Sequence, residues 1–152
     1  MFSFVSDDIL KAKTQAIVNP VNTVGVMGKG LALQFRNTYP NNYSAYQLAC
    51  NAGEVRPGRM LIFALGRIGY PNYIINFPTK RHWREKSKLE DIVSGLTALV
   101  DDALRLNIQS IAVPPLGCGL GGLPWPEVRR LMCAAFDQAP EVRWVIYGEG
   151  YF

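Results

Sequence analysis

The chain has 152 residues, of which 49% are apolar and 18% charged, a composition typical of one globular domain. The length excludes a two-domain enzyme, and the composition excludes a disordered or low-complexity chain. Lys and Arg exceed Asp and Glu by 16 to 12, which gives a net charge of +4. This excess favours an anionic partner only weakly, because mildly basic domains are common.

The cysteines and the single histidine do not form a metal-binding pattern. Cys50, Cys118 and Cys133 match neither a disulfide framework nor paired C-x-x-C ligands, and His82 has no histidine partner. We therefore expect no metal and no cofactor, with reduced thiols in the cytoplasm.

The N-terminal segment differs from an export signal. Asp7 and Asp8 stand where such a signal needs a cationic region and then a longer apolar run. We expect neither export nor insertion into a membrane.

Short apolar, β-branched segments alternate along the chain with longer segments of helical period. This alternation predicts an α/β sandwich around a single six-stranded sheet. The predicted strands are residues 1–5, 16–19, 59–65, 73–77, 110–114 and 144–148. The predicted helices are residues 30–37, 42–51, 88–106 and about 126–136. Several strand-to-helix junctions then face one edge of the sheet, where α/β proteins bind ligands.

The helix over residues 88–106 has the clearest boundaries. Its apolar residues recur every three or four positions, which predicts one buried face. Ser87 and Glu90 have the spacing of a capping box at its start. Asn107 can end it in a left-handed turn.

Two loops contain more glycine than a turn requires. Residues 22–30 (NTVGVMGKG) and residues 115–122 (PLGCGLGG) each lie between a predicted strand and a predicted helix. Glycine lets a backbone approach a ligand and expose its N–H groups, and the helix that follows adds its positive N-terminal end. A single glycine is more often only a permissive turn, but two such loops in one small domain favour a diphosphate ligand.

Neither loop matches a common nucleotide motif. The first is not a Walker sequence, because its glycines have the wrong spacing to Lys29 and Gly30 stands where Ser or Thr should bind magnesium. The second fits G-x-G-x-x-G, but one strand alone follows it and no acid lies about twenty residues further on. NTP hydrolysis and a dinucleotide-binding Rossmann unit are both disfavoured.

Three segments together resemble the macrodomain family, a mixed α/β fold that binds ADP-ribose. They are Asp8-Ile9, the run Ala16-Ile-Val-Asn-Pro-Val-Asn22, and Gly117-Cys-Gly-Leu-Gly-Gly122. The resemblance covers essentially the whole chain. It implies a three-layer α/β/α sandwich around a mixed six-stranded sheet, with residues 1–152 as a single macrodomain.

Two further segments resemble one branch of that family, which includes the human terminal ADP-ribose protein glycohydrolase and the bacterial DarG antitoxins. They are residues 26–32 (VMGKGLA) and residues 76–84 (NFPTKRHWR), and the second favours DarG. The DarG likeness implies an enzyme that removes ADP-ribose from thymidine bases of single-stranded DNA and so reverses a DarT-type toxin. DarG proteins usually carry a further C-terminal domain, so we expect this macrodomain to be the N-terminal part of a longer antitoxin.

The resemblance also implies roles for individual residues in binding ADP-ribose. Asp8, beside the Ile9 backbone, would accept a hydrogen bond from the adenine amino group, since a carboxylate is acceptor-only. Without the family, a helix cap would be the better interpretation of Asp8. Asn22 would hold the distal ribose hydroxyls, with an Asx-turn as the alternative. Tyr147 is a candidate for packing on adenine, although a core tyrosine explains it equally well.

The diphosphate would be held by backbone groups of both glycine loops. The N–H groups of Gly119, Leu120 and Gly121 are the expected donors, with Gly28 and its neighbours closing from the other side. The implied binding residues of the two loops are Gly28, Gly117, Cys118, Gly119, Leu120 and Gly121.

Lys80 is the residue we expect to carry the chemistry. In the resembling hydrolases the matching lysine attacks or otherwise activates the anomeric carbon of the distal ribose. A nucleophilic lysine needs a lowered pKa, which burial or the nearby Arg81 and Arg84 can provide; the alternative is a solvated surface lysine. Relatives of the human enzyme pair their lysine with an acid, and Gly121 stands at that position here.

The segment that begins at Lys80 also has the composition of a nucleic-acid contact. Arg81 and Arg84 can neutralise phosphates, and His82 and Trp83 can stack on unpaired bases. The alternative is a solvated loop whose tryptophan turns into the core.

Two other functions remain open at this point. One is hydrolysis of ADP-ribosylated protein carboxylates or of O-acetyl-ADP-ribose. The other is a non-catalytic reader of ADP-ribose, for which the missing acid at Gly121 is the best argument.

Overall fold

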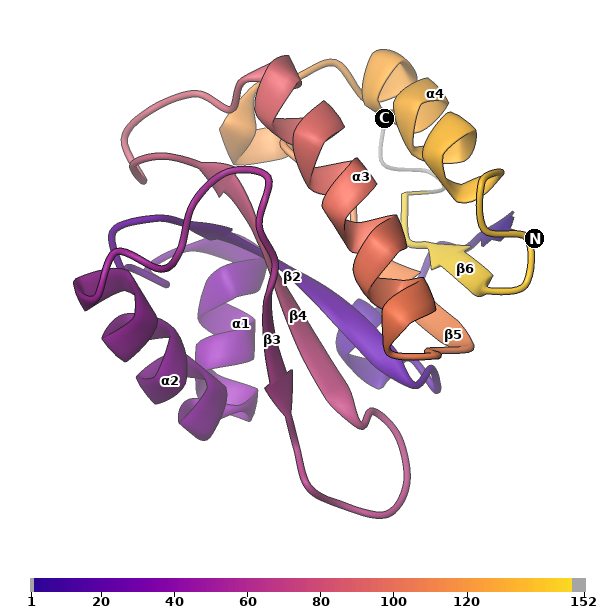
Figure 1. Ribbon diagram of the computed structural model, residues 1–152. Helices are drawn as coiled ribbons and strands as arrows, with labels where there is room; N and C mark the ends of the chain where they lie inside the picture. Colours follow the sequence, from indigo (N-terminus) through magenta and orange to yellow (C-terminus); the bar gives the residue numbers. More distant parts are fainter. Residues whose placement is uncertain (1, 149–152) are drawn as a thin grey trace.

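The computed structural model describes residues 2–148, and one six-stranded sheet runs through its centre (Figure 1). The strands are β1 (Phe2–Phe4), β2 (Ala16–Asn22), β3 (Leu61–Ala64), β4 (Tyr73–Lys80), β5 (Ser110–Val113) and β6 (Arg143–Ile146). They lie in the order β1-β6-β5-β2-β4-β3, in which β3 is antiparallel to β4 and the other neighbours are parallel. The predicted mixed sheet is confirmed.

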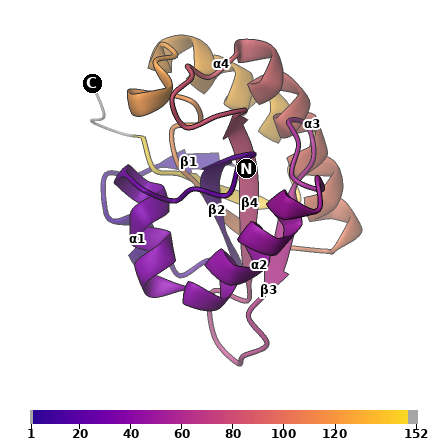
Figure 2. The same cartoon turned by 90° about the vertical axis from the view of Figure 1, so that its left-hand side faces the viewer.

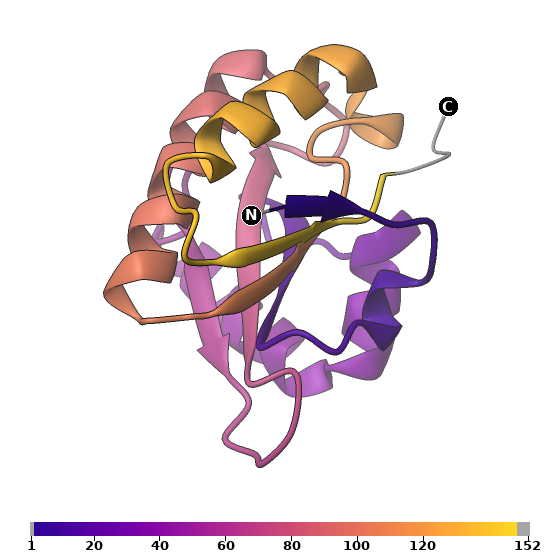
Figure 3. The ribbon, with the colours of Figure 1, turned by 90° about the vertical axis from the view of Figure 1, so that its right-hand side faces the viewer.

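Helices cover both faces of this sheet. They are α1 (Gly30–Thr38), α2 (Pro40–Asn51), α3 (Leu89–Arg105) and α4 (Trp125–Phe136), and two short 3-10 helices, η1 (Ile9–Lys11) and η2 (Gly119–Gly121), lie in loops. Figure 2 looks onto the face covered by α1 and α2, whereas Figure 3 shows α4 above the edge strand β1 and α3 along the left-hand side of the sheet. Within residues 2–148, no helix combines the length and the apolar composition that a membrane crossing requires.

Side chains of the central strands alternate between the two faces, as the period of a β-strand requires. In β2, Val18 packs in the core beneath α3 and α4, whereas Ile17 packs in the core beneath α1. In β4, Phe77 packs in the core beneath α3 and α4, and Ile74 packs in the core beneath α1. Both faces of these strands are therefore buried, and the predicted three-layer α/β/α sandwich is confirmed.

β2 and β4 each extend three residues beyond their predicted ends. Both extensions contain a proline, at positions 20 and 78, which lacks the N–H of a strand ladder. β2 pairs with β5 only at Ala16 and Ile17, and the pairing of β3 with β4 ends at Asn76. Both prolines therefore lie where their strand has a neighbour on one side only. The extension carries β2 and β4 past the rest of the sheet as a two-stranded projection.

The start of α3 differs from the predicted capping box. Lys88 is the N-cap residue and makes no side-chain capping bond. The Ser87 N–H donates instead to the carbonyl of Gly121 at 2.9 Å, which fixes Ser87 against the second glycine loop and turns it away from the cap position. The capping box is therefore wrong, whereas Asn107 has the expected left-handed conformation, with φ of 55°.

Candidate functional site

Three loops meet beyond the projecting ends of β2 and β4. The loop after β2 is tied to the loop after β4, because the Thr23 hydroxyl donates to the carbonyl of Arg81 at 2.5 Å. The loop after β5 is tied to the same segment by the bond from Ser87 to Gly121. A side chain at Gly30 would contact Leu120 at 3.4 Å, so the two glycine loops face each other.

Asn22 organises the first glycine loop from the end of β2. Its side-chain oxygen accepts from the N–H groups of Val24 at 3.1 Å and Val26 at 3.3 Å, and its amide donates to the Val26 carbonyl at 2.7 Å. This is the Asx-turn role that was the alternative in the sequence. One amide N–H remains for a ligand, and the exposed fraction of Asn22 is 7%.

A buried tyrosine on α2, which the sequence did not indicate, holds Asn22 in place. The hydroxyl of Tyr46, on α2, lies 2.8 Å from both the side-chain and the backbone oxygen of Asn22. Tyr46 is fully buried, and burial raises the pKa of its phenol. It therefore stays a hydrogen-bond donor to Asn22 at any physiological pH.

The first glycine loop ends at an open helix terminus. Gly25 and Gly30 have positive φ of 89° and 58°, which side chains rarely adopt, and Gly28 lies exposed between them. Lys29 is the N-cap residue of α1 and makes no side-chain capping bond. The first N–H groups of α1 therefore remain available to an anion, where the helix dipole favours negative charge.

The second glycine loop presents two donors rather than the three expected. Gly117 and Gly119 have positive φ of 73° and 62°. Within the described chain, the N–H groups of Gly119 and Leu120 have no protein acceptor. The N–H of Gly121 lies 3.3 Å from the Cys118 carbonyl, inside η2, and is therefore engaged.

Cys118 contributes its backbone to this loop. Its thiol is half-buried and lies 3.7 Å from the carbonyl of Leu116. Burial raises the pKa of the thiol to about 11, so it is protonated at neutral pH. It does not have the character of a nucleophile.

Asp8, Ile9 and Tyr147 gather at one end of the sheet. Asp8 caps η1 by accepting from the Leu10 N–H at 3.0 Å through one carboxylate oxygen, so the alternative of a helix cap is correct. Its other oxygen remains free to accept from a ligand amine, because Asp8 is exposed. The Ile9 side chain lies in the core, and its N–H has no acceptor among residues 2–148.

Tyr147 lies close to these carboxylates. It is half-buried and packs against the core beneath α1. Burial raises the pKa of Tyr147, and the charges of Asp7 and Asp8 act in the same direction. Tyr147 is therefore both a partly buried core tyrosine and a neighbour of the proposed adenine contact.

Lys80 ends β4 directly opposite Asn22 in the strand register, where Thr79 is an extra residue of β4 between the pairs Val21–Pro78 and Asn22–Lys80. Its amine lies 3.5 Å from the Trp83 carbonyl, a long hydrogen bond. Burial lowers the pKa of Lys80, and the charges of Lys86 and Lys29 lower it further. The cations that lower the pKa of Lys80 are thus Lys86 and Lys29, and not Arg81 and Arg84 as the sequence suggested.

The segment after Lys80 forms an exposed aromatic surface. Trp83 is 41% exposed rather than turned into the core, and His82 stacks on it with ring centroids 5.3 Å apart. The Arg84 guanidinium lies over the same ring at 4.5 Å. Arg81 turns away and forms two hydrogen bonds of 3.1 Å with the buried carboxylate of Asp91. Arg81, one of the four predicted DNA contacts, is therefore already engaged in an ion pair within the protein.

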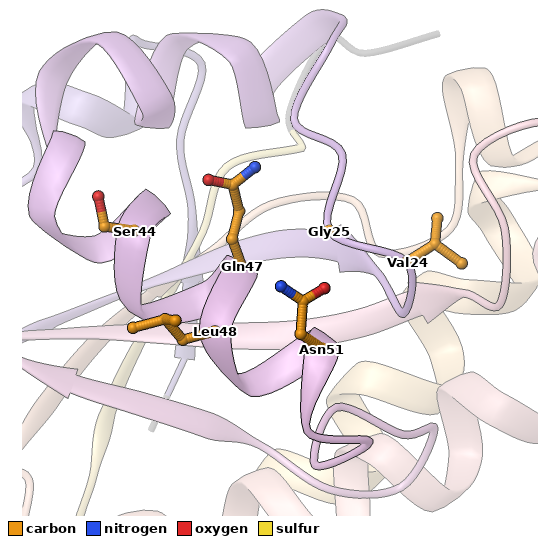
Figure 4. A pocket seen from close by; sticks show the side chains of 6 residues that line it. All are labelled: Val24, Gly25, Ser44, Gln47, Leu48 and Asn51. Atoms are coloured by element: carbon orange, nitrogen blue, oxygen red, sulfur yellow. The ribbon is translucent and has the colours of Figure 1, made fainter.

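A depression of about 420 Å³ lies between the loop after β2 and α2 (Figure 4). It is lined by Val24, Gly25, Ser44, Gln47, Leu48 and Asn51. None of these is a predicted site residue, and the lining has no charged group to hold a diphosphate. The contacts among the three loops therefore define the candidate site better than this hollow does. No cluster of three metal-ligating side chains occurs within residues 2–148.

Comparison with known proteins gives a consistent set of relatives. The Macro domain family model matches residues 18–132. The macrodomain of Mycobacterium tuberculosis DarG is 51% identical, with a TM-score of 0.95 and 96% of both chains covered. The macrodomain of Thermus aquaticus DarG is 48% identical, with a TM-score of 0.93 and 97% of both chains covered.

Longer relatives contain the same domain. The DNA ADP-ribosyl glycohydrolase of Mycobacterium tuberculosis is 52% identical over 97% of this chain, which spans 42% of that relative's length. Thermosipho africanus DarTG, solved in complex with ADP-ribose, is 36% identical with a TM-score of 0.87; the match covers 95% of this chain and 41% of that one. The chain belongs to the macrodomain family, within the group of the DarG macrodomains.

Proposed function

We propose that this chain is a DNA ADP-ribosyl glycohydrolase that removes ADP-ribose from thymidine bases of single-stranded DNA. One observation carries the proposal: a lysine with a lowered pKa lies where two glycine loops present free N–H groups. The name of the Mycobacterium tuberculosis relative supports this reaction, and the ADP-ribose bound to Thermosipho africanus DarTG supports the ligand. The modification it reverses is the product of a DarT-type toxin.

Different residues of the site bind different parts of ADP-ribose. The free oxygen of Asp8 accepts from the adenine amine, and Tyr147 packs on the ring. The N–H groups of Gly119 and Leu120, together with the open terminus of α1, hold the diphosphate. The remaining amide N–H of Asn22 donates to a distal ribose hydroxyl, which places that ribose beside Lys80.

Lys80 then acts on the anomeric carbon of this ribose. Its neutral amine attacks that carbon, and the bond between the carbon and the base nitrogen breaks. The proton lost by the amine passes to the base nitrogen. Opening of the ribose ring gives an imine-type intermediate, and water resolves it to free ADP-ribose and free Lys80. The lowered pKa matters because only the unprotonated amine has a lone pair to attack with.

The exposed stack of His82, Trp83 and Arg84 extends from the same site and suits an unpaired strand. A base stacks on the aromatic surface, and the guanidinium neutralises a phosphate. Because the carbonyl of Trp83 also contacts the Lys80 amine, a strand bound here lies next to the reacting lysine.

A release assay tests the proposal. A single-stranded oligonucleotide that carries ADP-ribose on thymidine is incubated with the wild-type chain, with Lys80→Ala, and with Lys13→Ala as an exposed control lysine. We expect the wild type and the control to release ADP-ribose and Lys80→Ala to release none. Release from an ADP-ribosylated peptide or from O-acetyl-ADP-ribose, but not from DNA, would move the assignment to those substrates. Binding of ADP-ribose in calorimetry without turnover of any substrate would identify a reader.

A further inference from the structure

Ser87 has a buried hydroxyl without a hydrogen-bond partner among residues 2–148. Its exposed fraction is 6%, and within residues 2–148 its hydroxyl oxygen has neither a donor nor an acceptor. A buried hydroxyl left unpaired costs about 1–3 kcal/mol. Its backbone is fixed by the bond to Gly121, which holds the residue against the second glycine loop. Such a group points to a partner that binds during function.

The Ser87 hydroxyl lies against the second glycine loop and beside Lys80. A Cβ at Gly121 would collide with the Ser87 oxygen and would approach the Ser87 Cβ to 3.1 Å. The same position lies 3.9 Å from Cε of Lys80. The hydroxyl and the lysine side chain therefore flank one glycine, and that glycine has no side chain because Ser87 fills the space.

We infer that Ser87 is a positioning residue for Lys80, whose amine donates a hydrogen bond to the Ser87 hydroxyl when substrate is bound. A neutral amine has two N–H groups and one lone pair. The Trp83 carbonyl accepts from one N–H at 3.5 Å in this structure. With the second N–H on Ser87, both hydrogens are fixed and the lone pair has a defined direction toward the reacting carbon. This inference rests on the proposed function.

A hydroxyl suits this role better than a carboxylate would. A negative charge within about 4–6 Å of a lysine stabilises the ammonium form and raises the lysine pKa. The charged groups that act on Lys80 are the cations Lys86 and Lys29, which together with burial lower its pKa. An uncharged acceptor orients the amine without opposing that effect.

Three variants test the inference in single-turnover assays on ADP-ribosylated single-stranded DNA. Ser87→Ala should lower the rate about tenfold, the loss of one hydrogen bond, while the dissociation constant for ADP-ribose stays unchanged. Ser87→Cys replaces the hydroxyl with a somewhat larger thiol that still fills the site but is a weak acceptor, so it should be nearly as slow. Ser87→Asp should move the rising limb of the pH–rate profile to higher pH. Ser94→Ala is the control, because the Ser94 hydroxyl is satisfied by the carbonyl of Asp91 at 3.3 Å.

Thermal unfolding separates a loss of function from a loss of fold. A full rate in Ser87→Ala would overturn the inference, and so would a Ser87→Asp profile that coincides with that of the wild type. A Ser87→Cys variant with the wild-type rate would reduce Ser87 to a packing role and overturn it as well. If the wild type itself releases no ADP-ribose from DNA, the proposed function fails before Ser87 is tested.

Discussion

Substituting Tyr46 with phenylalanine removes the hydroxyl that holds Asn22 and that also contacts the Cys50 thiol and the Gly25 backbone. The hydroxyl is fully buried and lies 2.8 Å from both oxygens of Asn22. In the variant the side-chain oxygen of Asn22 keeps two N–H donors, but its backbone oxygen loses this partner. A buried hydrogen bond contributes about 0.5–1.5 kcal/mol, and here one hydroxyl contacts two oxygens. We expect the free energy of unfolding to fall by about 1–2 kcal/mol.

This loss should lower the melting temperature by roughly 2–8 °C, given about 2–4 °C per kcal/mol for a chain of this size. Because Asn22 also fixes the first glycine loop, affinity for ADP-ribose should fall about threefold to tenfold. Scanning calorimetry measures the stability, and titration calorimetry at 20 °C, well below the transition, measures the affinity.

Tyr43→Phe is the matched control. Tyr43 also lies on α2, but its hydroxyl accepts from Gln47 at 2.9 Å and has no bond to the loop. Its removal should leave affinity for ADP-ribose unchanged. If Tyr46→Phe is destabilised but binds ADP-ribose as tightly as the wild type, Tyr46 does not position the binding loop, and our reading of the Asn22 bonds is refuted.

Three further predictions follow from the loops and the charges around Lys80. Lys86→Ala removes a cation that lowers the Lys80 pKa, so that pKa should rise; the ascending limb of the pH–rate profile should move to higher pH, and activity on this limb should fall about twofold to fivefold. An unmoved limb would show that Lys86 does not act on Lys80. Trp83→Ala should weaken binding of modified single-stranded DNA about tenfold by fluorescence anisotropy and leave binding of free ADP-ribose unchanged; equal losses for both ligands would contradict a stacking role. Gly119→Ala places a side chain at a φ of 62° and should lower ADP-ribose affinity at least about tenfold, while circular dichroism remains that of the folded chain; unchanged affinity would exclude this loop as the diphosphate site.

The order and type of the helices and strands could be predicted from sequence because hydrophobic periodicity and glycine positions report local structure directly. The ends of β2 and β4 could not be predicted. Pro20 and Pro78 are tolerated because each strand has a single neighbour there, and strand neighbours are a property of the whole sheet.

The candidate site likewise contains residues that could be predicted from sequence and residues that could not. The glycine loops and Lys80 are visible in sequence, because unusual composition marks them. Tyr46 and Ser87 are not visible in sequence. For Tyr46, the helical period of α2 does not indicate which backbone group the tyrosine hydroxyl will reach. Ser87 has the spacing of a helix cap, and only its long-range bond to Gly121 shows that it belongs to the site. Residues of this kind reach the site only through the fold, so their sequence neighbours do not reveal them.

The central claim is that Lys80 cleaves the bond between ADP-ribose and a DNA base, while the glycine loops bind ADP-ribose independently of it. The most direct measurement compares wild type and Lys80→Ala on thymidine-ADP-ribosylated single-stranded DNA, with titration calorimetry of ADP-ribose on the same samples. We predict loss of release by the variant together with an ADP-ribose dissociation constant within about threefold of the wild type, since removing a partly exposed lysine costs little binding energy. Release by Lys80→Ala at the wild-type rate would contradict the account.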